Sequence, residues 1–286
     1  MRARLQITNF KLPIQVLLLT CNLQFAICND NSPSGARSSG LANASVSLSD
    51  LWSVQNNQAG LGFHKTMDAG VFYQNQFMLR ELSTKAFAMT LPTKRGTFGV
   101  CVSNFGYSLF SQNKYGLAFG KAFGENISAG VMMDYVQTAI PEYGKKGVLV
   151  AEAGIQAKPA KNIILGVHVF NLTRTRLASY NDERIPTIMK LGANYKFSDK
   201  VFMALETEKD IDKKAMFKTG LEYKPVKELC LRAGISTNPS LSCFGFGINL
   251  KNFQLDLSST YHSTFGFSPQ MGLNYRFDSH SKNQAK

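Results

Sequence analysis

The chain has 286 residues, of which 44% are hydrophobic and 18% are charged, and its formal net charge is +13 at pH 7. A charged fraction below the roughly 25% of an average soluble domain argues against a disordered chain. A mean hydropathy of −0.12 is too polar for a bundle of membrane-spanning helices, and a pI near 9.5 raises the question of where the positive charge lies.

Residues 1–28 have the pattern of an export signal. Arg2, Arg4 and Lys11 precede an apolar stretch that ends in small residues near Cys28. Polar residues interrupt the stretch, so it is a poor transmembrane helix, which needs about 20 apolar residues. We therefore predict a cleaved secretory signal peptide, whose removal takes away three positive charges.

From residue 67 to residue 277, hydrophobic and small or polar residues alternate in segments of about ten residues. Such alternation is typical of β-strands. We predict fourteen strands, at 67–77, 83–91, 97–107, 114–123, 127–137, 147–158, 162–172, 187–197, 201–208, 215–224, 229–237, 241–250, 253–262 and 265–277. Short turns alternate with mostly longer loops, which is the pattern of an outer-membrane barrel with both termini in the periplasm.

One face of these strands is consistently large and apolar, whereas the other carries Gly, Ala, Ser and charged residues. A soluble β-sandwich or a lipocalin-like barrel also alternates, but its outward face is polar. We therefore predict an all-β fold, a monomeric 14-stranded antiparallel transmembrane β-barrel in the bacterial outer membrane. The barrel is expected at 67–277, followed by a polar C-terminal tail at 278–286, with membrane lipid around it.

The inward face is expected to carry a polar network in the lumen, made of Glu152, His168, Lys190, Glu206, Glu208, Glu222, Arg232, Asp68 and Arg276. Symmetry about the short turns places Glu152 nearly opposite His168. Asp68 and Arg276 are expected within about 10 Å across the seam between the last strand and the first. The charges either neutralise one another in a partly wet lumen or, at Glu152 and His168, form a proton-sensitive gate.

Two further contacts follow from the same pairing. Lys190 is expected near Glu206 and Glu208, and Glu222 is expected diagonal to Arg232.

A second inward set is apolar and lies near the outer rim: Phe105, Tyr107, Val136, Val148, Val150, Phe170 and Leu172. Apolar residues in a lumen need a cover. The cover is either the N-terminal segment or a folded-in loop, or else the residues form a pocket for a hydrophobic ligand or a groove for a cargo segment.

We predict no enzyme, cofactor or metal site. The three cysteines of the exported chain are too widely spaced for a metal site or a disulfide framework, and they are Cys101, Cys230 and Cys243. His262 has hydroxyl neighbours but no acidic residue placed to orient it. Basic residues concentrate at the short turns, which fits lipid headgroups or an acidic periplasmic partner rather than nucleic acid: Lys94, Arg95, Lys158, Lys161, Lys196, Lys200, Lys224, Lys227 and Lys251.

Residues 29–66 do not alternate and carry two short motifs. They read Gly35-Ala-Arg-Ser-Ser-Gly-Leu-Ala-Asn-Ala44 and Asp50-Leu-Trp-Ser-Val-Gln-Asn-Asn-Gln-Ala-Gly-Leu61. This pattern resembles the N-terminal signature of the PorV/PorQ family of Bacteroidota, a branch of FadL-like barrels. Gln58 stands where that signature has proline. The resemblance implies that 29–66 folds into the barrel as a plug, with a short helix at 47–54 capped by Ser49 or Asp50.

The resemblance leaves the function open. PorV-like members act in type IX protein secretion, which implies secreted cargo or a periplasmic secretion-system protein as partner. FadL-like members carry hydrophobic small molecules across the outer membrane. A structural barrel with no transport role is the third alternative.

Overall fold

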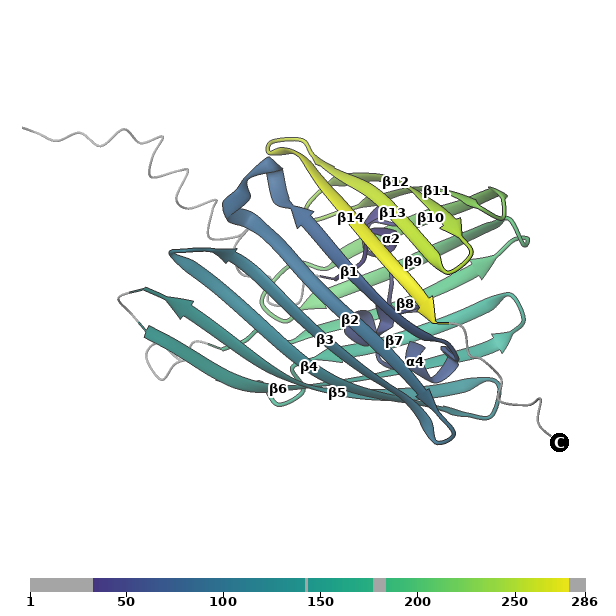
Figure 1. Ribbon diagram of the computed structural model, residues 1–286, viewed down its shortest axis with the longest axis horizontal. Helices are drawn as coiled ribbons and strands as arrows, with labels where there is room; N and C mark the ends of the chain where they lie inside the picture. The colour runs from purple at the N-terminus through teal and green to yellow at the C-terminus, as the bar shows by residue number, and fades with distance from the viewer. Residues whose placement is uncertain (1–32, 142–143, 177–183, 278–286) are drawn as a thin grey trace, which may run out of the picture. The chain divides into compact units, whose positions relative to one another are not determined.

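The computed structural model describes residues 33–141, 144–176 and 184–277. The predicted signal peptide and the predicted C-terminal tail lie outside these residues. The described chain contains one closed antiparallel sheet in which each strand pairs with its neighbours in sequence and β1 pairs with β14 (Figure 1). This confirms the predicted 14-stranded barrel.

The strands lie within a few residues of the predicted bounds. They are β1 (Met67–Asn75), β2 (Ser83–Thr93), β3 (Gly96–Tyr107), β4 (Phe110–Phe123), β5 (Ile127–Ile140), β6 (Gly144–Ala160), β7 (Ile163–Phe170), β8 (Ile188–Lys196), β9 (Val201–Asp210), β10 (Met216–Val226), β11 (Leu229–Ser236), β12 (Leu241–Leu250), β13 (Phe253–His262) and β14 (Gly266–Phe277). The largest differences are at β4 and β6, which begin earlier than predicted. Backbone pairing there continues past the apolar alternation, as at Ser111 with Ala139 and Gly144 with Ile140.

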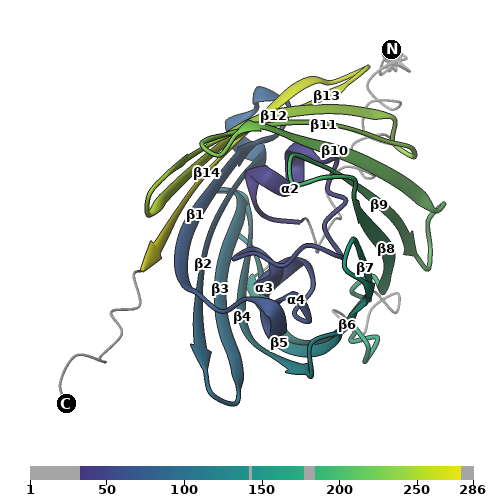
Figure 2. The same ribbon diagram turned by 90° about the vertical axis from the view of Figure 1, so that its right-hand side faces the viewer.

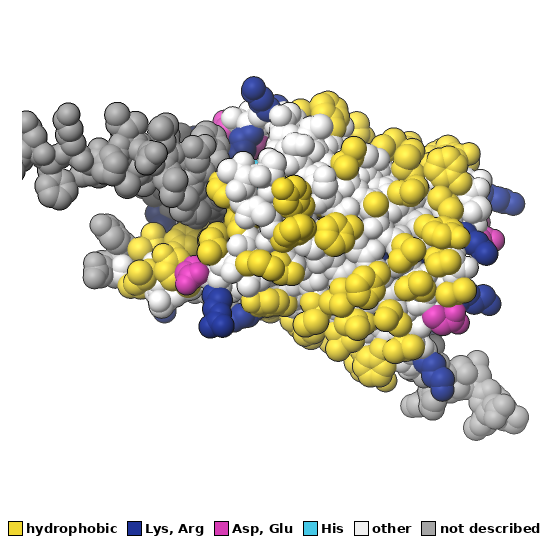
Figure 3. All heavy atoms as spheres, turned by 90° about the horizontal axis from the view of Figure 1, so that it is seen from above, with side chains coloured by type: hydrophobic (Ala, Val, Ile, Leu, Met, Phe, Trp, Pro, Cys, Tyr) yellow, Lys and Arg dark blue, Asp and Glu magenta, His cyan; other side chains and the backbone are white. Residues whose placement is uncertain are grey.

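The two faces of the sheet have opposite chemistry. Large hydrophobic side chains such as Leu117, Val131 and Leu191 project outward and are exposed. Figure 3 shows these apolar side chains spread over the barrel surface, with Lys and Arg gathered beyond them at the right-hand end. An apolar outer face on a closed sheet is the arrangement that lets β-strands span lipid.

The connections distinguish the two ends of the barrel. We call the end with the connections between β2 and β3, β4 and β5, β6 and β7, β8 and β9, β10 and β11, and β12 and β13 the turn end, and the opposite end the loop end. In outer-membrane barrels the short turns face the periplasm. The loop end also carries two short 3-10 helices, η1 (Gln76–Met78) and η2 (Arg80–Leu82).

Residues 33–66 lie inside the ring of strands, as Figure 2 shows. They form three short helices, α2 (Ala36–Gly40), α3 (Ser53–Asn56) and α4 (Gly60–Phe63). We call residues 33–66 the plug. None of the described helices is long and apolar enough to cross a membrane.

The helix expected at 47–54 is present only in the last two residues of that stretch, because α3 begins at Ser53 and the residues before it are turns, a bend and irregular chain. Neither Ser49 nor Asp50 is its N-cap, which is Trp52 and has no side-chain cap hydrogen bond. Asp50 Oδ1 accepts a hydrogen bond from the backbone N–H of Trp52 at 3.0 Å, and the N–H of Asp50 donates to Ser53 Oγ at 3.0 Å. This local bonding of an Asp side chain favours a turn over a helix. The chain becomes helical only at Ser53.

Glycines on the inner face of the sheet allow the plug backbone to touch the wall. A Cβ at Gly130 would collide with the backbone of Gln58, and one at Gly166 would collide with the carbonyl of Val46. The glycine-rich inner face therefore serves a close approach between backbones.

Candidate functional site

One buried ionic cluster joins β4, β5, β6 and β7 to the plug. Lys114 Nζ lies 2.8 Å from Glu152 Oε1 and 3.1 Å from Asp134 Oδ2. Glu152 Oε2 lies 3.0 Å from His168 Nε2 and accepts a hydrogen bond of 2.8 Å from Gln58 Nε2. All five side chains are buried. The cluster thus holds Gln58 of the plug against the barrel wall. A proton-sensitive gate at Glu152 and His168 stays a prediction.

A second cluster lies on β8, β9 and β10. Lys218 Nζ is 3.0 Å from Glu206 Oε1 and 2.6 Å from Glu208 Oε2. Lys190 lies opposite Glu208 in the register, but its Nζ is 3.9 Å from the carboxylate and makes no hydrogen bond with a described residue. Glu206 Oε2 accepts two backbone hydrogen bonds of 2.8 Å from the plug segment 45–46. Lys190 thus lies near Glu208 as expected, while Lys218, which sequence reasoning missed, makes the close hydrogen bonds to both carboxylates.

The third cluster anchors the first plug helix. Arg37 binds Glu222 through two nitrogens, at 3.0 and 3.1 Å, and Asp50 through a third at 3.1 Å. Arg232 donates to Glu222 at 2.7 Å and to Asp256 at 2.6 Å. Burial alone would lower the pKa of Arg37, but the charges of Glu222 and Asp50 outweigh it and raise that pKa above its ordinary value. The guanidinium is therefore permanently charged and fixed in place.

Glu222 and Arg232 are directly opposite each other rather than diagonal. A register shift between Tyr223 and Val226 of β10 moves the pairing by one residue. Strand pairing deduced from symmetry about the turn assumes a regular register, so it could not predict this shift.

The seam between β1 and β14 holds a smaller ionic group. Asp68 and Arg276 are paired in the register, and Arg276 Nε lies 3.4 Å from Asp68 Oδ1. His64 Nε2 of the plug lies 3.2 Å from Asp68 Oδ2. The same nitrogen lies 3.3 Å from Thr66 Oγ1, so the group lacks the two-sided histidine that a catalytic triad needs.

His262 is also unsuited to act as a base. Its Nδ1 faces the backbone N–H groups of Thr264 at 3.1 Å and Phe265 at 3.4 Å. It therefore stabilises the turn between β13 and β14.

The apolar set near the outer rim is only partly assembled as expected. Val136, Val150 and Phe170 are buried in one cluster, and Val148 packs against it. Ile185 and Ile188, which sequence reasoning missed, complete it. We call these six residues the apolar cluster. It lies at the loop end, on β5, β6, β7 and β8 and on the connection that follows β7.

Three members of the predicted pocket do not join the apolar cluster. Tyr107 is 42% exposed at the end of β3, and Leu172 is 51% exposed. Leu172 comes after the end of β7, and the positive φ of 56° at Asn171 ends the strand geometry. Phe105 instead packs against Phe110 of β4, with ring centroids 6.4 Å apart.

A loop residue covers part of the apolar cluster. The carbonyl of Ile185 accepts a hydrogen bond of 2.7 Å from Asn171 Nδ2, and its N–H donates to the carbonyl of Thr175 at 3.1 Å. Ile185 itself is 2% exposed. Of the alternatives left open by the sequence, a folded-in loop accounts for the cover seen here.

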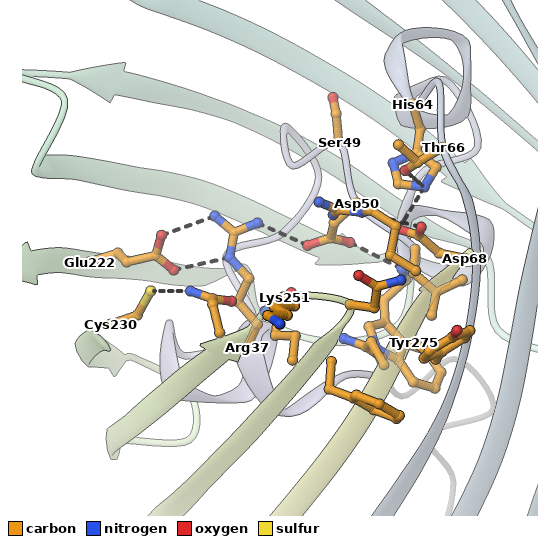
Figure 4. Close-up of a pocket in the computed structure, with 18 of the residues that line it drawn as sticks. Arg37, Ser49, Asp50, His64, Thr66, Asp68, Glu222, Cys230, Lys251 and Tyr275 are labelled. Carbon is orange, nitrogen blue, oxygen red and sulfur yellow. Dashed lines mark hydrogen bonds and ion pairs between the residues drawn. The ribbon is translucent and has the colours of Figure 1, made fainter. Parts of the chain in front are cut away.

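A cavity of about 400 Å³ lies at the turn end, between the plug and the wall from β10 to β14 and β1 (Figure 4). Arg37, Asp50 and His64 line it from the plug, and Glu222 and Lys251 line it from the barrel. Its walls are largely polar and charged. Sequence reasoning missed this cavity because the plug residues have no strand register.

No protein-family model and no curated protein matches the sequence. Among solved structures, the chain is similar to the CymD monoaromatic hydrocarbon channel, with 13% identity, a TM-score of 0.68, and coverage of 88% of this chain and 99% of that one. It is similar to the Ralstonia pickettii toluene transporter TbuX, at 10% identity and a TM-score of 0.68, over 87% of this chain and 100% of that one. It is also similar to a Pseudomonas aeruginosa FadL homologue, at 13% identity and a TM-score of 0.60, over 86% of this chain and 98% of that one. The chain therefore has the fold of a FadL-like bacterial outer-membrane β-barrel.

Proposed function

We propose that the barrel carries small hydrophobic molecules across the outer membrane. The apolar cluster at the loop end is the observation that supports this most directly, because it lies apart from the apolar residues by which the wall packs against the plug and is covered by a loop residue, Ile185. The similar structures described as a hydrocarbon channel and a toluene transporter support the same substrate class.

The floor of the apolar cluster is charged. Two residues further toward the turn end on the same strands lie Asp134, Glu152, His168 and Lys190. Lys114 Nζ also lies 5.1 Å from the centre of the Phe170 ring. An apolar molecule that displaces Ile185 would thus meet apolar walls above a polar floor, which holds it near the loop end.

The test is uptake of radiolabelled toluene by a bacterial host that lacks such a channel, with and without this protein. We expect faster uptake with the protein, and a several-fold slower rate for Phe170→Ala, which removes the largest apolar surface of the cluster. Phe217→Ala, on the exposed outer face, is the matched control and is expected to leave uptake unchanged. Equal uptake with and without the protein, and no amphiphile found by mass spectrometry of a lipid extract, would exclude the proposal.

A role in type IX secretion is the second candidate, supported by the motif pattern in 35–61. It requires that a strain lacking this protein accumulates type IX cargo inside the cell. Normal secretion in that strain would reject it. If neither transport nor secretion changes, a structural role of the barrel is the remaining alternative. No arrangement above supports an enzymatic role.

A further inference from the structure

The cavity at the turn end presents positive charge to whatever enters it. The carboxylates that line the cavity already form ion pairs or hydrogen bonds with other groups of the protein. Glu222 is held by Arg37 and Arg232, and Asp50 is held by Arg37 and the backbone of Trp52. Each of these carboxylates therefore has a partner on both of its oxygens and offers little to a ligand.

Asp68 is used in the same way, because it binds His64 through one oxygen and Arg276 through the other. Asp256, which does not line the cavity, forms an ion pair with Arg232. Among the described residues, the acidic groups around the cavity are thus all paired.

Three cations of the lining are different, since they come from three separate places and remain accessible. The side chain of Lys224 is 41% exposed and touches only one oxygen of Glu222, at 3.3 Å. The side chain of Arg276 is 56% exposed and binds Asp68 through Nε alone. Lys251, in the turn after β12, is exposed and has no ion pair with a described carboxylate.

Two aromatic side chains, Phe253 and Tyr275, belong to the lining of the cavity. Phe253, Tyr275 and Phe277 form a chain of ring contacts beside it, with successive centroids 4.8 Å apart. Phe253 and Phe277 are exposed on the outer face. Aromatic side chains at the edge of the apolar belt mark the interface with the headgroups.

We propose that this cavity binds the phosphate group of an anionic ligand on the periplasmic side, with Lys224, Lys251 and Arg276 as donors. A phosphate has several acceptor oxygens and suits cations that approach from different directions. The cavity volume falls within the range of small-molecule sites. The phosphate comes either from a phospholipid headgroup of the periplasmic leaflet or from a small soluble phosphate ester.

The experiment uses the purified full-length protein in a non-ionic detergent. Native mass spectrometry measures binding of phosphatidylglycerol, of diacylglycerol, which lacks the phosphate, and of glycerol phosphate. We expect phosphatidylglycerol to bind better than diacylglycerol. The K224Q/K251Q variant is expected to weaken that binding about tenfold or more.

Two controls separate this site from general attraction to a basic surface. Lys161→Gln and Lys200→Gln remove exposed turn lysines that do not line the cavity, and both are expected to bind as the unaltered protein does. Lys251→Gln alone, which breaks no ion pair within the described residues, keeps the test valid if the double variant does not fold.

If glycerol phosphate competes with phosphatidylglycerol for binding, the site is assigned to a soluble phosphate ester. If it does not compete, the site is assigned to the lipid headgroup. Equal binding of diacylglycerol and phosphatidylglycerol would overturn the proposal. So would an equal loss of binding in the control variants. The result is independent of hydrocarbon uptake, since the cavity and the apolar cluster lie at opposite ends of the barrel.

Discussion

At the scale of single residues, three glutamates of the barrel wall bind the plug. Glu152 accepts from the side chain of Gln58, Glu206 accepts from the plug backbone at 45–46, and Glu222 binds Arg37 through two nitrogens. Each glutamate also contacts a cation of another strand, which is the next strand for Glu206 and Glu222 and the strand beyond β5 for Glu152. A buried carboxylate is stable only when such partners replace its water, so wall and plug depend on each other.

Lys114 tests this dependence. Lys114→Met leaves Asp134 and Glu152 close together without their shared cation. We expect the free energy of unfolding in detergent to fall by about 3–5 kcal/mol, the usual cost of removing one partner of a buried ion pair. Lys145→Met, at an exposed position on β6, is the control. An equal stability for the two variants, measured by urea denaturation, would contradict the argument.

At the scale of elements, plug and sheet fit because their backbones are in direct contact. Strands that face a lumen do not need glycine, but strands that face a chain lying against them do. Gly130 and Gly166 occupy such positions on β5 and β7. The plug is therefore matched to the wall in shape as well as in charge.

Gly130→Ala is expected to force the plug away from β5 and to lower the free energy of unfolding by about 1–3 kcal/mol, as overpacking does. Gly272→Ala, on β14, is the matched control, because its nearest neighbour would lie 3.5 Å from the new Cβ and no movement is needed. The measurement is thermal unfolding together with limited proteolysis of the plug. Equal melting temperatures and equal cleavage rates would show that the close contact at Gly130 is unimportant.

At the scale of the barrel, the plug separates two chemically different regions of the lumen. The apolar cluster lies at the loop end and the cationic cavity at the turn end. The plug fills the space between them with bonds to at least five strands, including those of Gln156 to the carbonyls of Val46 and Leu48, and of Asn194 to that of Ser47. Such a lumen is expected to conduct few ions.

Removal of residues 33–66 tests this expectation. In planar bilayers the full-length protein should show little conductance, whereas the deleted barrel should form an open, water-filled pore, because its inner face is polar. Heat-dependent migration on a gel shows whether the deleted barrel is folded. If the deleted barrel does not fold, the Arg37→Leu variant is used in its place. This substitution removes three hydrogen bonds between Arg37 and carboxylates and is expected to raise the conductance in part. A folded but non-conducting deleted barrel would contradict the idea that the plug blocks the lumen.

The sequence alone determined the number of strands, their approximate bounds and the chemistry of their two faces. These follow from alternation with period two, which is a local property, and from the contrast between lipid and lumen, which acts on every strand alike. The apolar positions Val136, Val150 and Phe170 were found for the same reason. Lys114, Asp134, Lys218 and Asp256 also have inward parity, so the same signal could have found them.

Strand pairing read from the sequence brought Glu152 to His168 and Asp68 to Arg276, but the tertiary structure decided the other charge contacts. The register shift in β10 set Arg232 directly opposite Glu222, and Lys218 joined Lys190 at the carboxylates of β9 and made the shorter contacts. The contacts of Arg37 and the insertion of Ile185 depend on the plug and on a loop, whose sequences have no hydrophobic alternation from which a structure can be predicted. A single-residue change of register, or the path of a loop, alters such contacts completely while leaving the alternation unchanged, which is why the pattern defines the barrel but not its interior.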